Sequence, residues 1–290
     1  MRRLLLALGS AAVVLPAAYG AFEPRLPAPE AQLGPRIAFD DDSHDVWVVR
    51  ADGSQRRRLT SDPAPKFDPT WSPKGSKLAY RSEVDGNAEI YVLNADGSGK
   101  RNLTRNPAED YSPAWSPGGK RIAFASSRSG VLNDIYVMNA DGSHIRRVTR
   151  HVSADEYPTW SPNGKRIAFA SDRGGRWEIF AIDLDGRHER RITRAGGKAP
   201  GWSPRGPLIA YQGPRGSAAG DQRMSALWLV GTDGRRARRV ASNAGVPAWR
   251  PDGKAILVTR PGRGLVLLSL DGRVRARVAP PPAIDADWVR

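Results

Sequence analysis

The residues of this chain whose type and spacing most resemble a metal-binding site are carboxylates in predicted loops. The run Asp40-Asp-Asp42, with His44 and Asp45, offers donors for a cation, and Asp183-Leu-Asp-Gly186 resembles half of a calcium loop. Calcium takes about six to eight oxygen ligands, however, and the turns that correspond to the second segment read Asn-Ala-Asp-Gly, which is a hairpin sequence. We therefore predict loops at both places and no metal site.

The sequence contains none of the common catalytic motifs. Four histidines lie in predicted loops without paired metal-ligand spacing; they are His44, His144, His151 and His188. No Gly-x-Ser-x-Gly elbow and no Gly-x-x-x-x-Gly-Lys phosphate loop occurs in the sequence. The chain has no cysteine, which rules out disulfides, thiol catalysis and zinc–thiolate sites. We predict no catalytic residues, no metal and no cofactor.

A repeated motif divides the chain into units of similar length. Trp-Ser-Pro-x-Gly, or a drifted copy of it, begins at Trp71, Trp115, Trp160, Trp202 and Trp249, and Trp288 starts a sixth copy. The steps between them are close to the period of about 40 to 45 residues that one four-stranded propeller blade occupies. Because these tryptophans recur at one position of the unit, we expect them to pack between blades and not to stack on a ligand.

Each unit contains short apolar runs between turn residues. In one unit they are Lys120–Ala125 and Asp134–Met138, followed by the turn Asn139-Ala-Asp-Gly142. Short runs rich in β-branched and aromatic residues predict strands. Asp-Gly recurs between such runs, as tight hairpins require, at Asp52, Asp96, Asp141, Asp185, Asp233 and Asp271. We predict an all-β, six-bladed β-propeller of four-stranded antiparallel blades.

The two ends of the repeat array predict how the ring closes. The first unit begins at Arg36-Ile-Ala-Phe39 without a preceding Trp-Ser-Pro, and Asp285-Ala-Asp-Trp288 is the piece that it lacks. If the C-terminal strand joins the first blade as its innermost strand, no blade keeps an unpaired edge at the seam. We assign residues 36–290 to the closed propeller.

These units resemble the repeats of the TolB propeller. The resemblance rests on Pro158-Thr-Trp-Ser-Pro-Asn-Gly-Lys-Arg-Ile-Ala-Phe-Ala-Ser-Asp-Arg-Gly-Gly175, Glu178-Ile-Phe180 and Asp185-Gly186, and it covers residues 36–290. TolB-type repeats are also similar to the propellers of prolyl-oligopeptidase-type enzymes. TolB carries a globular domain ahead of its propeller, and we expect none here, because only residues 21–35 separate the predicted leader from the first predicted strand. The resemblance implies the propeller fold and a protein-interaction role in the cell envelope.

The N-terminal segment reads as a secretion signal. Met1-Arg-Arg3 is positively charged, Leu4–Leu15 is apolar, and Ala18-Tyr-Gly20 places small residues at a cleavage site. We therefore predict a signal peptide over residues 1–20, a Pro-rich linker over 21–35 and an extracytoplasmic location, periplasmic or secreted. The alternative is that the leader stays uncleaved as a membrane anchor.

The net charge of +15 raises the question of nucleic acid. Basic pairs recur on the predicted outermost strand of successive units, among them Arg56-Arg-Arg58, Arg146-Arg147, Arg190-Arg191 and Arg238-Arg239. A nucleic-acid binder would gather its charge in one groove with interleaved aromatic residues, whereas this pattern spreads it around a rim. We predict no nucleic-acid binding, weak attraction to anionic surfaces and a monomer.

The variable loops predict the binding face. In an up-and-down blade, the Trp-Ser-Pro and Asp-Gly turns share one face and the more variable loops share the other. Acidic residues with aromatic neighbours gather in the variable loops, which suits a basic or peptide-like protein partner in the envelope; ordinary solvated turns are the alternative. The candidate binding residues are Phe67, Asp68, Asp110, Tyr111, Asp155, Glu156, Tyr157, Arg173 and Trp177.

We therefore predict an exported, non-enzymatic interaction module. Two alternatives stay open, because a propeller hosts unrelated functions. One is a carbohydrate-active or lyase-type propeller, and the other is a membrane-tethered extracytoplasmic sensor domain.

Overall fold

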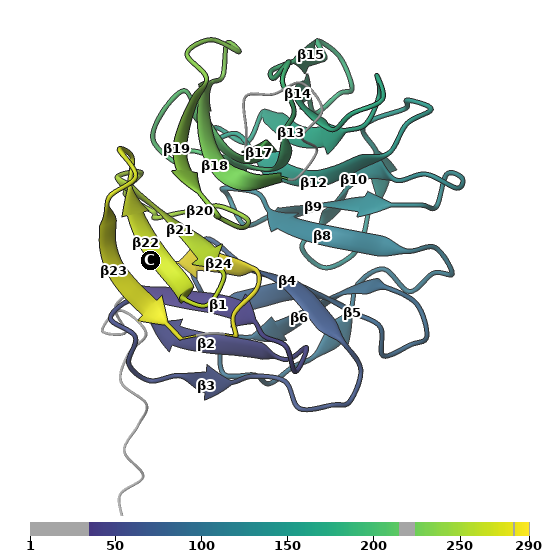
Figure 1. The fold of residues 1–290 in the computed structure, drawn as a ribbon. Coiled ribbons are helices and arrows are strands. Elements are labelled where there is room, and N and C mark those ends of the chain that lie inside the picture. Colours follow the sequence, from purple (N-terminus) through teal and green to yellow (C-terminus); the bar gives the residue numbers. More distant parts are fainter. Residues whose placement is uncertain (1–34, 215–223, 281, 290) are drawn as a thin grey trace, which may run out of the picture. The chain divides into compact units, whose positions relative to one another are not determined.

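A computed structural model describes residues 35–214, 224–280 and 282–289 of the protein (Figure 1). The predicted signal peptide and residues 21–34 of the predicted linker lie outside the described residues. Gly34–Arg290 is one compact unit. Its described residues form β-strands and no helix, and the strands make six four-stranded antiparallel sheets. The predicted all-β six-bladed propeller is confirmed.

The blades follow the chain, each from its innermost to its outermost strand. The first three are β24 (Ala286–Val289), β1 (Arg36–Asp40), β2 (Val46–Arg50) and β3 (Arg57–Arg58); β4 (Lys66–Trp71), β5 (Lys77–Ser82), β6 (Glu89–Asn94) and β7 (Arg101–Asn102); and β8 (Asp110–Trp115), β9 (Arg121–Ser126), β10 (Asp134–Asn139) and β11 (Arg146–Arg147). The last three are β12 (Asp155–Trp160), β13 (Arg166–Ser171), β14 (Glu178–Asp183) and β15 (Arg190–Arg191); β16 (Lys198–Trp202), β17 (Leu208–Pro214), β18 (Met224–Gly231) and β19 (Arg238–Ser242); and β20 (Ala248–Trp249), β21 (Ala255–Arg260), β22 (Gly264–Ser269) and β23 (Val274–Ala279).

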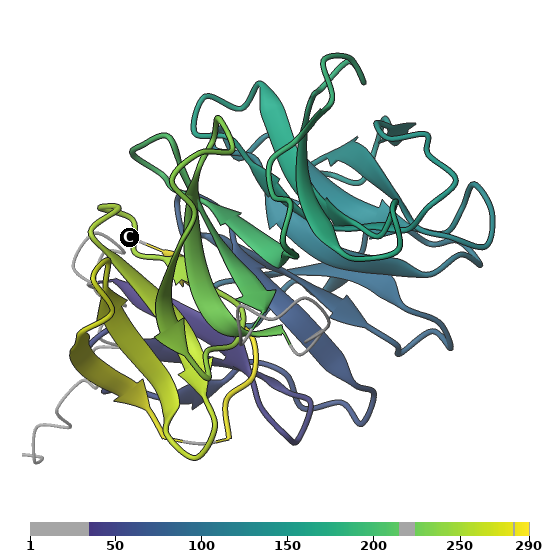
Figure 2. The same cartoon turned by 45° about the horizontal axis from the view of Figure 1, so that its top comes forward.

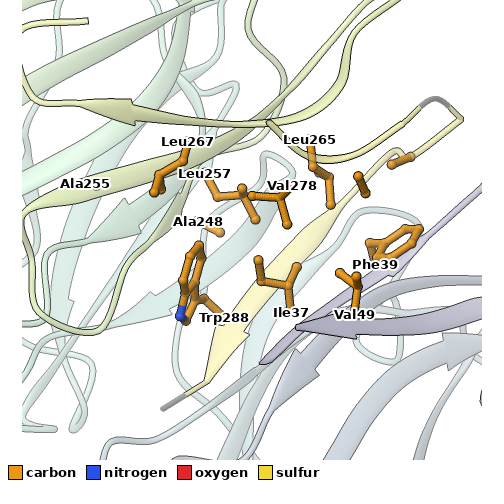
Figure 3. Close-up of a cluster of buried hydrophobic side chains, with 12 residues drawn as sticks. Ile37, Phe39, Val49, Ala248, Ala255, Leu257, Leu265, Leu267, Val278 and Trp288 are labelled. Atoms are coloured by element: carbon orange, nitrogen blue, oxygen red, sulfur yellow. The ribbon is translucent and has the colours of Figure 1, made fainter. Parts of the chain in front are cut away.

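The ring closes through the C-terminal strand, as the ends of the array predict. Strand β24 pairs with β1, with Trp288 opposite Ile37, and the yellow sixth blade lies beside the purple first blade (Figure 2). Trp288 packs in a buried cluster that joins Ile37 of the first blade to Leu257 and Val278 of the sixth (Figure 3). The seam is therefore a hydrophobic blade boundary like the others.

The repeated tryptophans pack between blades, as expected. Trp71, Trp115, Trp160, Trp249 and Trp288 each belong to a different buried cluster, and Trp202 packs against a sixth. Two indoles also donate hydrogen bonds to the preceding blade: Trp160 Nε1 to the Ala114 carbonyl at 2.9 Å and Trp249 Nε1 to the Gly201 carbonyl at 2.8 Å. Burying such large rings stabilises each boundary.

The arginine pairs of the rim also hold blades together. Arg57 donates to the carbonyls of Ala95 and Asp96 in the next blade at 2.9 Å, and Arg146 donates to Leu184 at 2.6 Å. The second arginine of a pair stays in its own blade, where Arg147 lies 2.7 Å from the buried Asp134. Much of the rim charge is thus engaged within the fold, a role that the repeat pattern did not indicate.

Candidate functional site

A cavity of about 550 Å³, which we call the tunnel, lies on the propeller axis. Residues of all six innermost strands line it, together with a set of turn prolines, Pro73, Pro117, Pro162, Pro204 and Pro251. These prolines belong to the Trp-Ser-Pro turns and their drifted copy, so the cavity extends to the face that carries the short, repetitive turns. A concave space enclosed by rigid strands is the default position for a binding site.

In blades two to five, a β-bulge in the inner strand aims one residue at the axis. In blades two to five, the residue three positions before the tryptophan has positive φ, for example 53° at Asp68 and 54° at Tyr157. The strand register shifts at the same place, because two residues oppose one on the partner strand. The side chains that this position brings to the cavity wall are Asp68, Ser112, Tyr157, Ala199, Val246 and Asp285.

The charged side chains that line the cavity are acidic and come from the first two blades: Asp68, Asp285 and Asp287. Asp287 has a structural role, because its Oδ2 accepts hydrogen bonds from the Trp71 amide at 2.7 Å and from the Thr70 hydroxyl at 3.0 Å. These bonds fasten β24 to the second blade. Asp68 and Asp285 are then the remaining acidic groups of the cavity wall. We call these two residues the inner ring.

A third carboxylate, Asp40, adjoins this pair. Asp40 ends β1, is fully buried, and has no hydrogen-bond partner for either carboxylate oxygen among the described residues. Burial first, and then the negative charges of Asp285 and Asp68, raise the pKa of Asp40 to about 9. Burial and Asp68 likewise raise the pKa of Asp285 to about 7. We call Asp40, Asp68 and Asp285 the acidic cluster.

Arg81 partly offsets the acidic cluster. Its charge lowers the pKa of Asp285, but the carboxylate with which it forms an ion pair is Glu83, at 3.8 Å. Its guanidinium also lies 3.9 Å from the ring centre of Phe67 and 5.4 Å from that of Tyr111. Arg81 therefore offsets only part of the negative charge of the acidic cluster, in which Asp40 is protonated at neutral pH.

Replacing Asp285 by Asn should stabilise the protein at alkaline pH. A raised pKa keeps Asp285 protonated in the folded chain, and the stabilisation from that proton is lost as the pH rises from about 4 to about 7. Asp285→Asn lacks this loss, so we expect about 1–3 kcal/mol more unfolding free energy at pH 8 and little change near pH 4. Urea denaturation at both pH values measures it. A difference that does not vary with pH would contradict the raised pKa.

Two predicted binding residues are inside the fold. Asp110 and Asp155 are fully buried at the starts of β8 and β12, and form ion pairs with Arg128 at 2.9 Å and Arg173 at 3.0 Å. The expectation that these carboxylates face solvent in variable loops is wrong, because the strands begin earlier than the loop pattern suggests. Arg173 is engaged in the same way and also forms an ion pair with Glu189.

The other predicted residues lie around the inner rim. Asp68 and Tyr157 line the cavity, as described, and Phe67 and Tyr111 flank Arg81. Lys198 lies 5.0 Å from the ring centre of Tyr157, 4.3 Å from that of Trp177, and 3.6 Å from the Glu156 carboxylate. Trp177 also packs against the core between blades four and five.

Sequence reasoning missed Asp40 as a neighbour of Asp68, and it missed Asp285 entirely. The repeat contained a signal for Asp285, since it stands three residues before Trp288 as Asp68 stands three before Trp71.

Among the described residues, no group of three or more His, Cys, Asp or Glu side chains has an arrangement that could hold a metal ion. In that part of the chain, no helix has the length and hydropathy to span a membrane.

An axial cavity enclosed by six four-stranded blades defines a β-propeller scaffold for binding. Residues 107–284 match the TolB beta propeller domain, and residues 29–132 match the Tricorn protease N-terminal beta propeller domain. The first match covers more than half of the chain. The protein therefore belongs to the TolB beta propeller family.

Known proteins with the same fold have several roles. The Tol-Pal system protein TolB of Anaeromyxobacter dehalogenans (strain 2CP-C) is 54% identical over 41 residues, which are 13% of this chain and only 9% of that relative. TolB from Acinetobacter baumannii superposes with a TM-score of 0.73 and 22% identity, over 88% of this chain and 67% of that chain. An oligogalacturonate lyase in complex with manganese superposes with a TM-score of 0.57 and 15% identity, over 79% and 72%. At these identities, the two structures show the fold alone.

Proposed function

We propose that this protein is an exported, non-enzymatic interaction module of the cell envelope, and that its axial tunnel receives a cationic group of a protein partner. Membership of the TolB beta propeller family supports a role in protein interaction. The acidic cluster is the observation that favours a cationic ligand.

The acidic cluster is unfavourable for the isolated protein. Asp40 is buried without a hydrogen-bond partner among the described residues, and its negative neighbours raise its pKa further. A buried polar group without a hydrogen-bond partner lowers stability, and proteins commonly keep such groups where a ligand needs them. A lysine, arginine or terminal amine would neutralise the cluster, and a cavity of about 550 Å³ has room for one such side chain.

A lyase-type activity is the alternative class of function. Carboxyl groups with raised pKa values can act as general acids, and the fold is shared with an oligogalacturonate lyase. The negative charge of the tunnel, however, would repel an anionic oligosaccharide, which argues for the binding role. Cleavage of acidic oligosaccharides by the purified protein, abolished in Asp285→Asn, would favour the enzyme instead.

Removing the charge of the inner ring should weaken partner binding. The wild-type protein and the Asp68→Asn/Asp285→Asn variant would each capture proteins from an envelope extract, and the captured partner would be purified for affinity measurements. We expect about ten-fold weaker binding and a flatter salt dependence in the variant, because amides preserve shape while removing charge.

The matched control for this experiment is Asp185→Asn, which removes an exposed acid in an Asp-Gly turn outside the cavity lining. It should leave the affinity within about two-fold, as expected for a peripheral charge. Equal affinity of the wild-type protein and the inner-ring variant would place the binding surface outside the tunnel.

A further inference from the structure

The two most exposed large apolar side chains of the described residues, Val131 and Val152, lie on two neighbouring loops. Val131, 97% exposed, and Leu132, 47% exposed, lie between β9 and β10, and Val152, 87% exposed, lies between β11 and β12. The loops touch, because the Asp155 amide donates a hydrogen bond to the Asn133 carbonyl at 2.8 Å. We call Val131, Leu132 and Val152 the apolar tip.

Arginines without an acidic partner accompany the apolar tip. Arg150 is two residues from Val152, and Arg194 lies in the corresponding loop of the next blade. Both are exposed, and neither forms an ion pair within the described part of the chain. Asp172, on a loop of the same face, is engaged by the backbone, since its Oδ1 accepts a hydrogen bond from the Ala154 amide at 3.0 Å. The two loops of the apolar tip contain no acidic residue, so the charge that they themselves carry is positive.

We propose that the apolar tip and its arginines dock the propeller on the surface of a bilayer that contains anionic lipids. Apolar side chains that project from loops can enter the boundary between headgroups and acyl chains, while arginines bind lipid phosphates. A protein interface needs a packed apolar centre and about 800 Å² on each partner. Three side chains on projecting loops provide no such centre, which favours a fluid bilayer over a protein as the occupant.

This docking would also orient the tunnel. The β9–β10 and β11–β12 loops lie on the face opposite the Trp-Ser-Pro turns, because consecutive antiparallel strands reverse direction. The proline-lined end of the cavity would therefore point away from the bilayer and stay open to a partner. The proposal does not depend on what the tunnel binds.

The absence of cysteine from the sequence makes a site-specific test direct. Single Val152→Cys and Val274→Cys variants of the full chain would carry a fluorophore sensitive to polarity. Val274 is the matched control, because it is also an exposed valine, at 49%, but lies on the outer strand β23. The probes are vesicles of phosphatidylglycerol with phosphatidylcholine, and vesicles of phosphatidylcholine alone.

We expect emission at position 152 to rise about two-fold or more with anionic vesicles at low salt, and to change little with phosphatidylcholine alone. Position 274 should not respond. A probe at 152 that stays in a polar environment while the protein sediments with vesicles would overturn the proposal, since another segment would then be the anchor. No association with either vesicle, or equal responses at 152 and 274, would overturn it as well.

Charge variants add a second arm. Arg150→Gln/Arg194→Gln should weaken anionic-vesicle binding about ten-fold, whereas Arg187→Gln/Arg273→Gln, which removes two exposed arginines from the Asp-Gly turns, should do so far less. Equal losses in the two pairs would indicate attraction by net charge and refute this docking face. The Asp68→Asn/Asp285→Asn variant should leave the vesicle response unchanged, so the bilayer and tunnel proposals can fail separately.

Discussion

Deletion of residues 283–290 is expected to lower the free energy of unfolding by more than about 4 kcal/mol. The deletion removes β24, which is the innermost strand of the first blade, and exposes the edge of β1. It also removes Trp288 from the cluster between the first and sixth blades, and Asp287 from its bonds to β4. Urea denaturation of the truncated and full-length proteins measures the loss.

Single substitutions separate the contributions at the seam. Trp288→Ala alone should cost about 3–5 kcal/mol, as other buried aromatic truncations do. Val131→Ser, at a fully exposed loop position, should change stability by less than about 0.5 kcal/mol. If the truncated chain unfolds at the same denaturant concentration as the full-length one, the ring does not depend on its C-terminal strand.

Replacing Lys66 by Met should be nearly as damaging as the loss of the seam tryptophan. The Lys66 side chain is 1% exposed, and its Nζ lies 3.2 Å from the Asp45 carboxylate and 3.1 Å from that of Asp62. Without the ammonium group, the buried Asp45 keeps Arg58 as its one ionic partner among the residues that the structure describes. We expect a loss of about 2–4 kcal/mol in unfolding free energy, because breaking a buried ion pair leaves a charge without full compensation.

Lys100 provides the matched control for this substitution. Its Nζ lies 2.9 Å from the same Asp62 carboxylate, but its side chain is 34% exposed. Lys100→Met should therefore cost less than about 1 kcal/mol, as surface ion pairs do. Equal losses for the two lysines would show that burial does not govern the strength of these pairs.

Lys66 also shows that the buried charge at the start of the inner strand differs in sign between blades. It starts β4 at the position that Asp110 holds in β8 and Asp155 holds in β12. In those blades the acid is inside and an arginine approaches it, whereas in the second blade the cation is inside and acids surround it. A buried charge at this position is thus compensated in each of these blades, unlike the charge of the acidic cluster.

The acidic cluster links stability to the proposed function. Neutral substitutions there should raise stability at alkaline pH and weaken binding of a cationic partner. Opposite effects on stability and binding are expected where binding residues lower the stability of the fold. The same pattern would not arise from a purely structural role, because removal of a structural carboxylate lowers stability.

The sequence by itself determined the fold. The repeat period, the Asp-Gly hairpins and the missing Trp-Ser-Pro of the first unit predict the six blades and their closure, and the structure has both. These features are local in the chain or are repeated in it. Turn geometry and strand alternation depend on short-range sterics and hydrogen bonds, so a pattern of residues is enough to specify them.

Only the tertiary structure decided which acids are available. Asp110 and Asp68 look alike in the sequence, yet Arg128, 18 residues away, pairs with the buried Asp110, while a bulge with positive φ turns Asp68 into the tunnel. Asp285 reaches Asp68 only because the ring closes, which brings together strands from opposite ends of the chain. Burial and neighbouring charge set the state of a carboxylate, and both depend on contacts between residues far apart in the sequence.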